Sequence, residues 1–179
     1  EGYRTRMRLQ MGSLTEITVP EAMYSHEVVS RAFDVIERLD ALLSTYQPDS
    51  EVSLLARQGS LRVSPETMEI ARRSLDWAER TDGAFDPLLG PVIALWRRAV
   101  EEQRLPAPDA LEAARRLADF HRVRVDESAG TIAFPDPGMG FDFGAIGKGY
   151  AGDKAGESLL RDGVTIALLA SGGSSHRLI

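Results

Sequence analysis

The sequence contains no cysteine, which removes several kinds of chemistry at once. Its 179 residues can form no disulfide bond, no thiolate metal site and no cysteine nucleophile. Histidine is almost as scarce, because His26, His121 and His176 are the only three and lie far apart in the chain. A histidine-rich zinc site is therefore not expected, and any bound metal should prefer oxygen ligands.

The sequence also lacks long apolar runs, a signal peptide pattern and an excess of basic residues. No apolar stretch approaches the 18 or so residues that a membrane-spanning helix needs. The net charge of −6 argues against nonspecific nucleic-acid binding, so we expect no nucleic-acid partner. A negatively charged ligand would need a local positive pocket.

What is present fits an ordinary water-soluble globular protein, with 43% hydrophobic and 27% charged residues. We expect one domain over residues 1–179. The lack of cysteine leaves the compartment open. An exported chain on the periplasmic or cell-envelope side, touching the membrane only through a lipid anchor outside these residues, and a cytoplasmic chain both fit.

Periodic patterns predict an α+β fold with a mixed or antiparallel sheet packed against helices. Alternation predicts paired strands over residues 4–19, with a bulge or close approach at Met11-Gly12, and a hairpin over residues 122–134. Apolar spacing predicts a helix over residues 25–43, and Ser64-Pro65 is typical of a helix start. Residues 164–170 are expected to form a buried strand.

The stretch from Gly140 to Asp153 concentrates glycines, two carboxylates and a lysine where a strand is expected to lead into a helix. The pattern predicts a strand at Phe141 to Phe143 and a helix from about Lys148 to Leu160. Unpaired N–H groups at a helix start favour an anion such as a phosphate, and Lys148 would add a full charge there. A glycine-rich turn without any ligand is the open alternative.

The two familiar phosphate motifs do not fit this stretch. A P-loop would need glycine where Asp142 stands and a hydroxyl residue where Gly149 stands. The glycine spacing also differs from the dinucleotide-binding fingerprint. An anion bound here would therefore be held by some other fold.

Two further side chains are candidate ligand contacts, and for each of them a purely structural role is the open alternative. Tyr46 lies on a polar loop, where its ring can stack on a flat ligand or simply pack half-buried against the protein. Asp86 precedes Pro87 and can either contact a ligand or cap the next segment through its own carboxylate.

Taken in order, four segments resemble the ApbE family of flavin transferases, which move FMN from FAD onto a protein threonine or serine. The match covers nearly all 179 residues, and Ser171-Gly-Gly173 also fits. The four segments are Met11-Gly-Ser13, Ser44-Thr-Tyr-Gln-Pro-Asp-Ser-Glu51, Thr81-Asp-Gly-Ala-Phe-Asp-Pro87 with Gly90-Pro91 and Trp96, and Asp142-Phe-Gly-Ala-Ile-Gly-Lys-Gly-Tyr150 with Asp153.

The resemblance implies an α+β flavin transferase fold with FAD in a cleft. It implies that a Mg²⁺ ion accepts the backbone carbonyl of Ala145 as a ligand, and it assigns no catalytic side chain. The implied partners are FAD and an acceptor protein that carries the flavinylated threonine or serine. The implied contacts to the flavin nucleotide are Met11, Tyr46, Ala84, Phe85, Asp86, Asp142 and Lys148.

The resemblance covers the N-terminal and central part of the family only. The family's C-terminal part, with a His-x-x-Asp-Pro run and an Asp-x-x-x-Thr pair that completes the magnesium site, has no counterpart in these residues. We therefore expect a fold that is incomplete at its C-terminal end. Magnesium-dependent FMN transfer is the first hypothesis, with a non-catalytic FAD-binding protein and an FAD pyrophosphatase giving FMN and AMP as alternatives.

Overall fold

The computed structural model describes residues 2–179, which divide into two compact units. The sheet unit comprises residues up to Ala41 together with Gly144–Ile179, and the helical unit comprises Leu42–Phe143. Within the described residues, no helix is long and apolar enough to cross a membrane. The expectation of one domain over residues 1–179 stays a prediction, because one domain with two lobes would show the same division.

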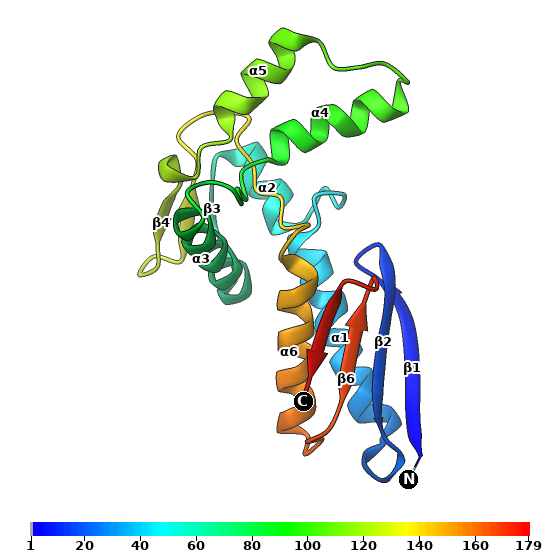
Figure 1. Ribbon diagram of the computed structural model, residues 1–179. Coiled ribbons are helices and arrows are strands. Elements are labelled where there is room, and N and C mark those ends of the chain that lie inside the picture. Colours follow the sequence, from blue (N-terminus) through cyan, green and yellow to red (C-terminus); the bar gives the residue numbers. More distant parts are fainter. Residues whose placement is uncertain (1) are drawn as a thin grey trace. The chain divides into compact units, whose positions relative to one another are not determined.

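The sheet unit is built on four antiparallel strands in the order β1-β2-β6-β7 (Figure 1). Its core face carries fully buried Ile17 and Val19, and α1 and α6 cover that face. The contact with α1 is also polar, because the Gln10 amide donates to the carbonyl of Phe33 over 2.9 Å. The elements are β1 (Tyr3–Gln10), β2 (Ser13–Pro20), η1 (Glu21–Met23), α1 (His26–Leu43), α6 (Gly147–Arg161), β6 (Leu168–Ser171) and β7 (Ser175–Leu178).

The first strand pair was predicted, but the role of its glycine was not. Met11 and Gly12 form the two-residue turn between β1 and β2, with φ of 50° and 68°. Two positive φ angles in a two-residue loop match the twist of a tight hairpin. The expected bulge inside one strand is therefore a hairpin turn, and the turn places the Met11 side chain at the end of the sheet.

The helical unit contains four helices and a small antiparallel sheet in the order β3-β5-β4. Ile70, Leu55 and Ile132 are fully buried in its core. The predicted hairpin is confirmed as β4 and β5. The elements are α2 (Glu51–Gln58), β3 (Ser60–Arg62), α3 (Pro65–Arg80), α4 (Gly90–Glu101), α5 (Pro108–Leu117), η2 (Phe120–Arg122), β4 (Arg124–Asp126) and β5 (Thr131–Ala133).

The helices α2 and α3 both begin after a serine whose hydroxyl accepts a hydrogen bond from the first turn of the helix. The Ser50 hydroxyl accepts the N–H of Ser53 over 3.1 Å, and the Ser64 hydroxyl accepts that of Thr67 over 3.3 Å. Each bond satisfies an N–H group that the helix itself leaves unpaired. The predicted start of α3 at Ser64-Pro65 is confirmed.

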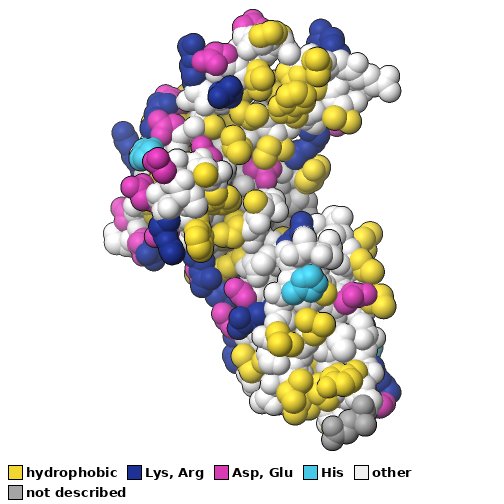
Figure 2. Space-filling view, viewed as in Figure 1, with side chains coloured by type: hydrophobic (Ala, Val, Ile, Leu, Met, Phe, Trp, Pro, Cys, Tyr) yellow, Lys and Arg dark blue, Asp and Glu magenta, His cyan; other side chains and the backbone are white. Residues whose placement is uncertain are grey.

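The helix pair α4 and α5 is less covered than the rest of the unit. No residue of α4 is fully buried, and Trp96, Val100 and Leu105 remain between 45% and 77% exposed. Apolar side chains gather over this pair in the space-filling view (Figure 2).

Two predicted strands are wrong in part or entirely. Phe141 to Phe143 form no strand; their rings are buried and stack on each other, with centroids 4.9 Å apart. The apolar alternation therefore marks an aromatic core segment. The strand expected over residues 164–170 begins only at Leu168, and Ile166 and Leu168 are 47% and 41% exposed. The run is half buried because only one face of the sheet is covered.

The start of α4 lies directly against the segment of residues 138–142. A Cβ atom added to Gly90 would stand 2.6 Å from the carbonyl oxygen of Gly140 and 3.2 Å from that of Phe141. The first of these distances is below any normal contact, and both obstructing atoms belong to the backbone. Only glycine at position 90 allows the two segments to approach this closely.

We expect Gly90→Ala to destabilise the protein by about 1 to 3 kcal/mol, because the backbone at Gly140 must move away. Chemical denaturation followed by circular dichroism measures the change. Gly149→Ala is the matched control, since an added Cβ there meets no atom within 4 Å. Equal stability of the two variants would contradict the close approach.

Candidate functional site

A hollow of about 430 Å³ lies in the helical unit. Its walls are the loop before α2, α2 itself, the start of α4 and the segment 138–142, and we call it the α2–α4 hollow. Tyr46 and Asp142, two residues that the sequence predicts for the flavin nucleotide, both line it. Its volume falls in the range of pockets that bind small organic ligands.

Tyr46 is presented to solvent, not packed half-buried. The residue is 76% exposed, and its backbone N–H donates to the Ser44 hydroxyl over 3.2 Å. The guanidinium of Arg97 lies over the ring, with its central carbon 3.9 Å from the ring centroid. The alternative of a merely packed tyrosine is therefore not what the structure shows.

Asp142 joins two of the four sequence segments through its backbone. Its N–H donates to the carbonyl oxygen of Pro87 over 2.8 Å. The segment from Thr81 to Pro87 is thus attached to the segment that forms the floor of the α2–α4 hollow. Motifs more than fifty residues apart in the sequence meet at this hydrogen bond.

Ala84, Phe85 and Asp86 lie on the loop that follows α3 and are not among the residues that line the hollow. The Thr81 hydroxyl donates to the carbonyl of Trp77 over 2.8 Å and accepts the N–H of Phe85 over 3.1 Å. One side chain therefore ends α3 and sets the course of this loop.

The Asp86 carboxylate caps its own segment, because it accepts the N–H of Leu88 over 2.8 Å. Burial raises the pKa of this carboxyl above its ordinary value, and the nearby charge of Asp119 raises it further. The hydrogen bond from the Leu88 N–H and the charge of His121 lower the pKa, but the net effect, led by burial, is a raised pKa. The capping alternative is thus observed, and whether Asp86 also contacts a ligand stays a prediction.

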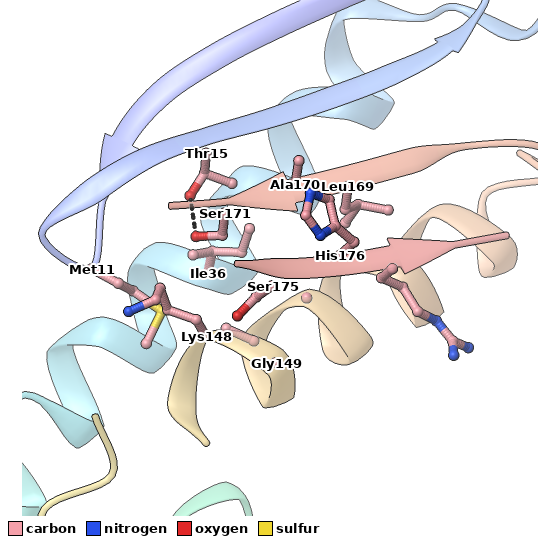
Figure 3. Close-up of a pocket in the computed structure, with 13 residues that line it drawn as sticks. Met11, Thr15, Ile36, Lys148, Gly149, Leu169, Ala170, Ser171, Ser175 and His176 are labelled. Carbon is pink, nitrogen blue, oxygen red and sulfur yellow. Dashed lines mark hydrogen bonds between the residues drawn. The ribbon is translucent and has the colours of Figure 1, made fainter. Parts of the chain in front are cut away.

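Met11 and Lys148 are brought together in the sheet unit, where both line a small pocket between the β1–β2 turn, α6 and the ends of β6 and β7 (Figure 3). The pocket holds only about 20 Å³, close to the size of one water molecule. The hydroxyls of Thr15 and Ser171 are hydrogen bonded over 2.9 Å beside it. This pocket has no room for an aromatic ring system.

The Lys148 side chain forms no hydrogen bond or ion pair with any residue between positions 2 and 179. It stands in the first turn of α6, which contains no acidic residue and has no side-chain cap at Ile146. The helix therefore presents free N–H groups and an uncompensated ammonium at the same end. Such an end favours an anion.

Ala145 lies in the exposed turn before α6. Its carbonyl oxygen is of the type that Mg²⁺ prefers. Among residues 2–179 no group of three histidine, aspartate or glutamate side chains is placed to hold a metal ion. The role of Ala145 as a magnesium ligand stays a prediction.

Sequence reasoning missed the two arginines of the hollow, Arg57 on α2 and Arg97 on α4. A signal for Arg97 was available. Gly90, Ala94 and Arg97 recur at four and three residues, which places them on one face of α4, and all three line the hollow. No comparable signal singles out Arg57.

The raised pKa of Asp86 predicts a pH-dependent difference in stability. Ionising this half-buried carboxyl disfavours the folded state, so the contribution of Asp86 to folding is complete below its unfolded pKa and is lost as the pH rises through its folded pKa. Asp86→Asn cannot ionise. We therefore expect the free energy of unfolding of this variant, minus that of the wild type, to increase from about pH 3 to about pH 7. Urea denaturation at both pH values tests this, and a difference independent of pH would contradict it.

The chain is similar to several flavin transferases in sequence. It matches the ApbE family over residues 11–178. The FAD:protein FMN transferase of Treponema pallidum is 32% identical over 185 residues, covering 97% of this chain and 51% of the relative. That of Klebsiella pneumoniae is 30% identical over 161 residues, covering 87% and 51%. The chain spans about half the length of these curated relatives.

Solved structures show the same fold. A mutant of the flavin transferase ApbE from Vibrio cholerae superposes with a TM-score of 0.89 at 22% identity, covering 99% of this chain and 60% of that one. The ApbE protein from Thermotoga maritima gives 0.88 at 25% identity, with 99% and 59% covered. The predicted α+β fold is confirmed, and the chain belongs to the ApbE family.

Proposed function

We propose that this chain takes part in the magnesium-dependent transfer of FMN from FAD to a threonine or serine hydroxyl of an acceptor protein. The observation that carries the proposal is the α2–α4 hollow, where Tyr46 and Asp142 from two separate family segments line one opening of about 430 Å³. The relatives' name, FAD:protein FMN transferase, supports the chemistry. A location on the periplasmic or cell-envelope side belongs to the same proposal, with a cytoplasmic location as the alternative.

In this proposal the predicted FAD contacts have different tasks. Tyr46 offers an exposed ring on which a flat heterocycle can stack. Lys148 and the free N–H groups at the start of α6 favour a phosphate group. Met11 lines the small pocket beside Lys148, and its backbone N–H donates to the Asp40 carboxylate over 3.2 Å.

The chemical step is a phosphoryl transfer without oxidation or reduction. The acceptor oxygen forms a bond to the phosphorus of the FMN half of FAD, and the bond from that phosphorus to the AMP phosphate breaks. AMP leaves with the electron pair, and the hydroxyl proton is lost. Magnesium, when bound, would supply positive charge at the pyrophosphate, with Ala145 as one of its ligands. Lys148 would neutralise phosphate charge from the protein side.

Activity is tested with the full-length protein, FAD, Mg²⁺ and a flavin acceptor domain. We expect covalent flavin on the acceptor and release of AMP, both abolished by removing Mg²⁺ with a chelator. FAD binding without AMP release would instead favour a non-catalytic binding protein. Free FMN without an acceptor would favour an FAD pyrophosphatase.

The proposed role of Lys148 is tested by affinity. We expect Lys148→Ala to weaken FAD binding by about 1 to 3 kcal/mol, the scale of a lost charge-assisted hydrogen bond. Fluorescence titration of FAD measures the change. Lys154→Ala on the same helix is the control, because Lys154 is engaged with Glu157 at 3.5 Å. Unchanged affinity in Lys148→Ala would remove the phosphate role.

A further inference from the structure

Two arginines from different helices hold the loop that carries Tyr46. Arg57 of α2 donates to the carbonyl oxygen of Pro48 over 2.5 Å. Arg97 of α4 reaches the Thr45 hydroxyl over 3.5 Å and covers the Tyr46 ring. The loop is therefore fixed at both ends of its exposed part, on one side by Arg57 and on the other by Arg97.

Arg97 lies over one face of the Tyr46 ring and leaves the other face open. A guanidinium 3.9 Å from the centroid covers one side of the ring, and Tyr46 is nevertheless 76% exposed. The guanidinium is planar and positively charged, so it can both stack on the ring and attract its electron-rich face. A cation over a tyrosine ring contributes about 0.5 to 1 kcal/mol at an exposed site.

Holding an exposed ring in one orientation has a direct effect on ligand binding. A free tyrosine side chain loses rotational freedom when a ligand stacks on it, and that loss weakens binding. A ring already fixed by Arg97 has lost this freedom before the ligand arrives. The α2–α4 hollow therefore presents a preformed stacking surface and not merely an exposed tyrosine.

We propose that Arg97 is a positioning residue for the flavin nucleotide: it holds the Tyr46 ring so that a flat heterocycle of FAD stacks on the open face. This inference rests on the proposed function. Arg97 lies outside the four sequence segments, and its proposed task is to orient the Tyr46 ring, not to bind phosphate. Both the isoalloxazine and the adenine of FAD are flat heterocycles that could occupy the face.

The affinity test compares three variants of the full-length protein with the wild type by FAD fluorescence titration. We expect Arg97→Gln to weaken FAD binding about two- to fivefold, the fold-change that corresponds to a lost cation–π contact of about 0.5 to 1 kcal/mol. Arg97→Lys should recover only part of the affinity, because the ammonium keeps the charge but not the planar stack. Arg98→Gln is the matched control: it is the next residue of the same helix, it is exposed, and it does not line the hollow.

A double variant separates positioning from direct contact. If Arg97 acts through the ring, Arg97→Gln should have no further effect in a Tyr46→Leu background. Additive losses in the double variant would overturn the positioning role.

The two heterocycles are distinguished with FMN and ADP as separate probes. If isoalloxazine stacks on Tyr46, Arg97→Gln weakens FMN binding and leaves ADP binding unchanged. If adenine stacks there, the pattern is reversed. Either pattern supports the inference, whereas unchanged affinity for both probes and for FAD overturns it.

A measurement without ligand keeps the inference separate from the proposed function. Chymotrypsin cleavage after Tyr46, identified by mass spectrometry, should be faster in Arg97→Gln than in the wild type and in Arg98→Gln. Equal cleavage in all three proteins would refute the fixed loop even if FAD binds. Faster cleavage in a protein that binds no FAD would refute the proposed function and retain the role of Arg97 in holding the ring.

Discussion

The close approach of two backbones at Gly90 and Gly140 is the constraint on which the helical unit's site depends. A side chain at position 90 would separate the start of α4 from the segment 138–142, since even a methyl group there would stand 2.6 Å from the Gly140 oxygen. A Cβ atom added at Gly140 would instead meet the Cβ atom of Ala56 in α2 at 3.4 Å, close to an ordinary contact distance. The walls of the α2–α4 hollow therefore depend on glycine at position 90, which lets α4 begin against residues 138–142.

The same convergence explains why motifs distant in sequence work together. Once α4 is fixed against residues 138–142, the N–H of Asp142 meets the carbonyl of Pro87 at 2.8 Å, and the loop after α3 is attached to the floor of the hollow. The Tyr46 loop is then held from α4 by Arg97. Backbone packing thus comes first, and the side chains that face a ligand are positioned by it.

The sequence predicted those features whose causes lie within a few residues of one another, and it missed those that depend on distant contacts. Helices capped by Ser50 and Ser64 were predictable, because the capping residue and its partner are three residues apart. The segment from Phe141 to Phe143 was not, because alternating apolar residues need a partner strand to form a ladder, and the partner here is a set of stacked rings. Arg97 was missed because its function depends on a tyrosine fifty-one residues earlier in the chain.

The start of α6 differs from the Tyr46 loop, where another side chain of the protein holds the residue that faces the ligand. At the start of α6 the side chain is left without a partner: among residues 2–179 none pairs with Lys148, and the first turn carries neither an acid nor a cap. Gly149 beside it lowers helix propensity by about 1 kcal/mol relative to alanine, yet no atom within 4 Å would obstruct a Cβ there. Packing within the chain therefore does not require glycine at this position. A cation beside the free N–H groups of a helix start is unfavourable for the folded protein alone, and under the proposed function a bound phosphate would offset this cost.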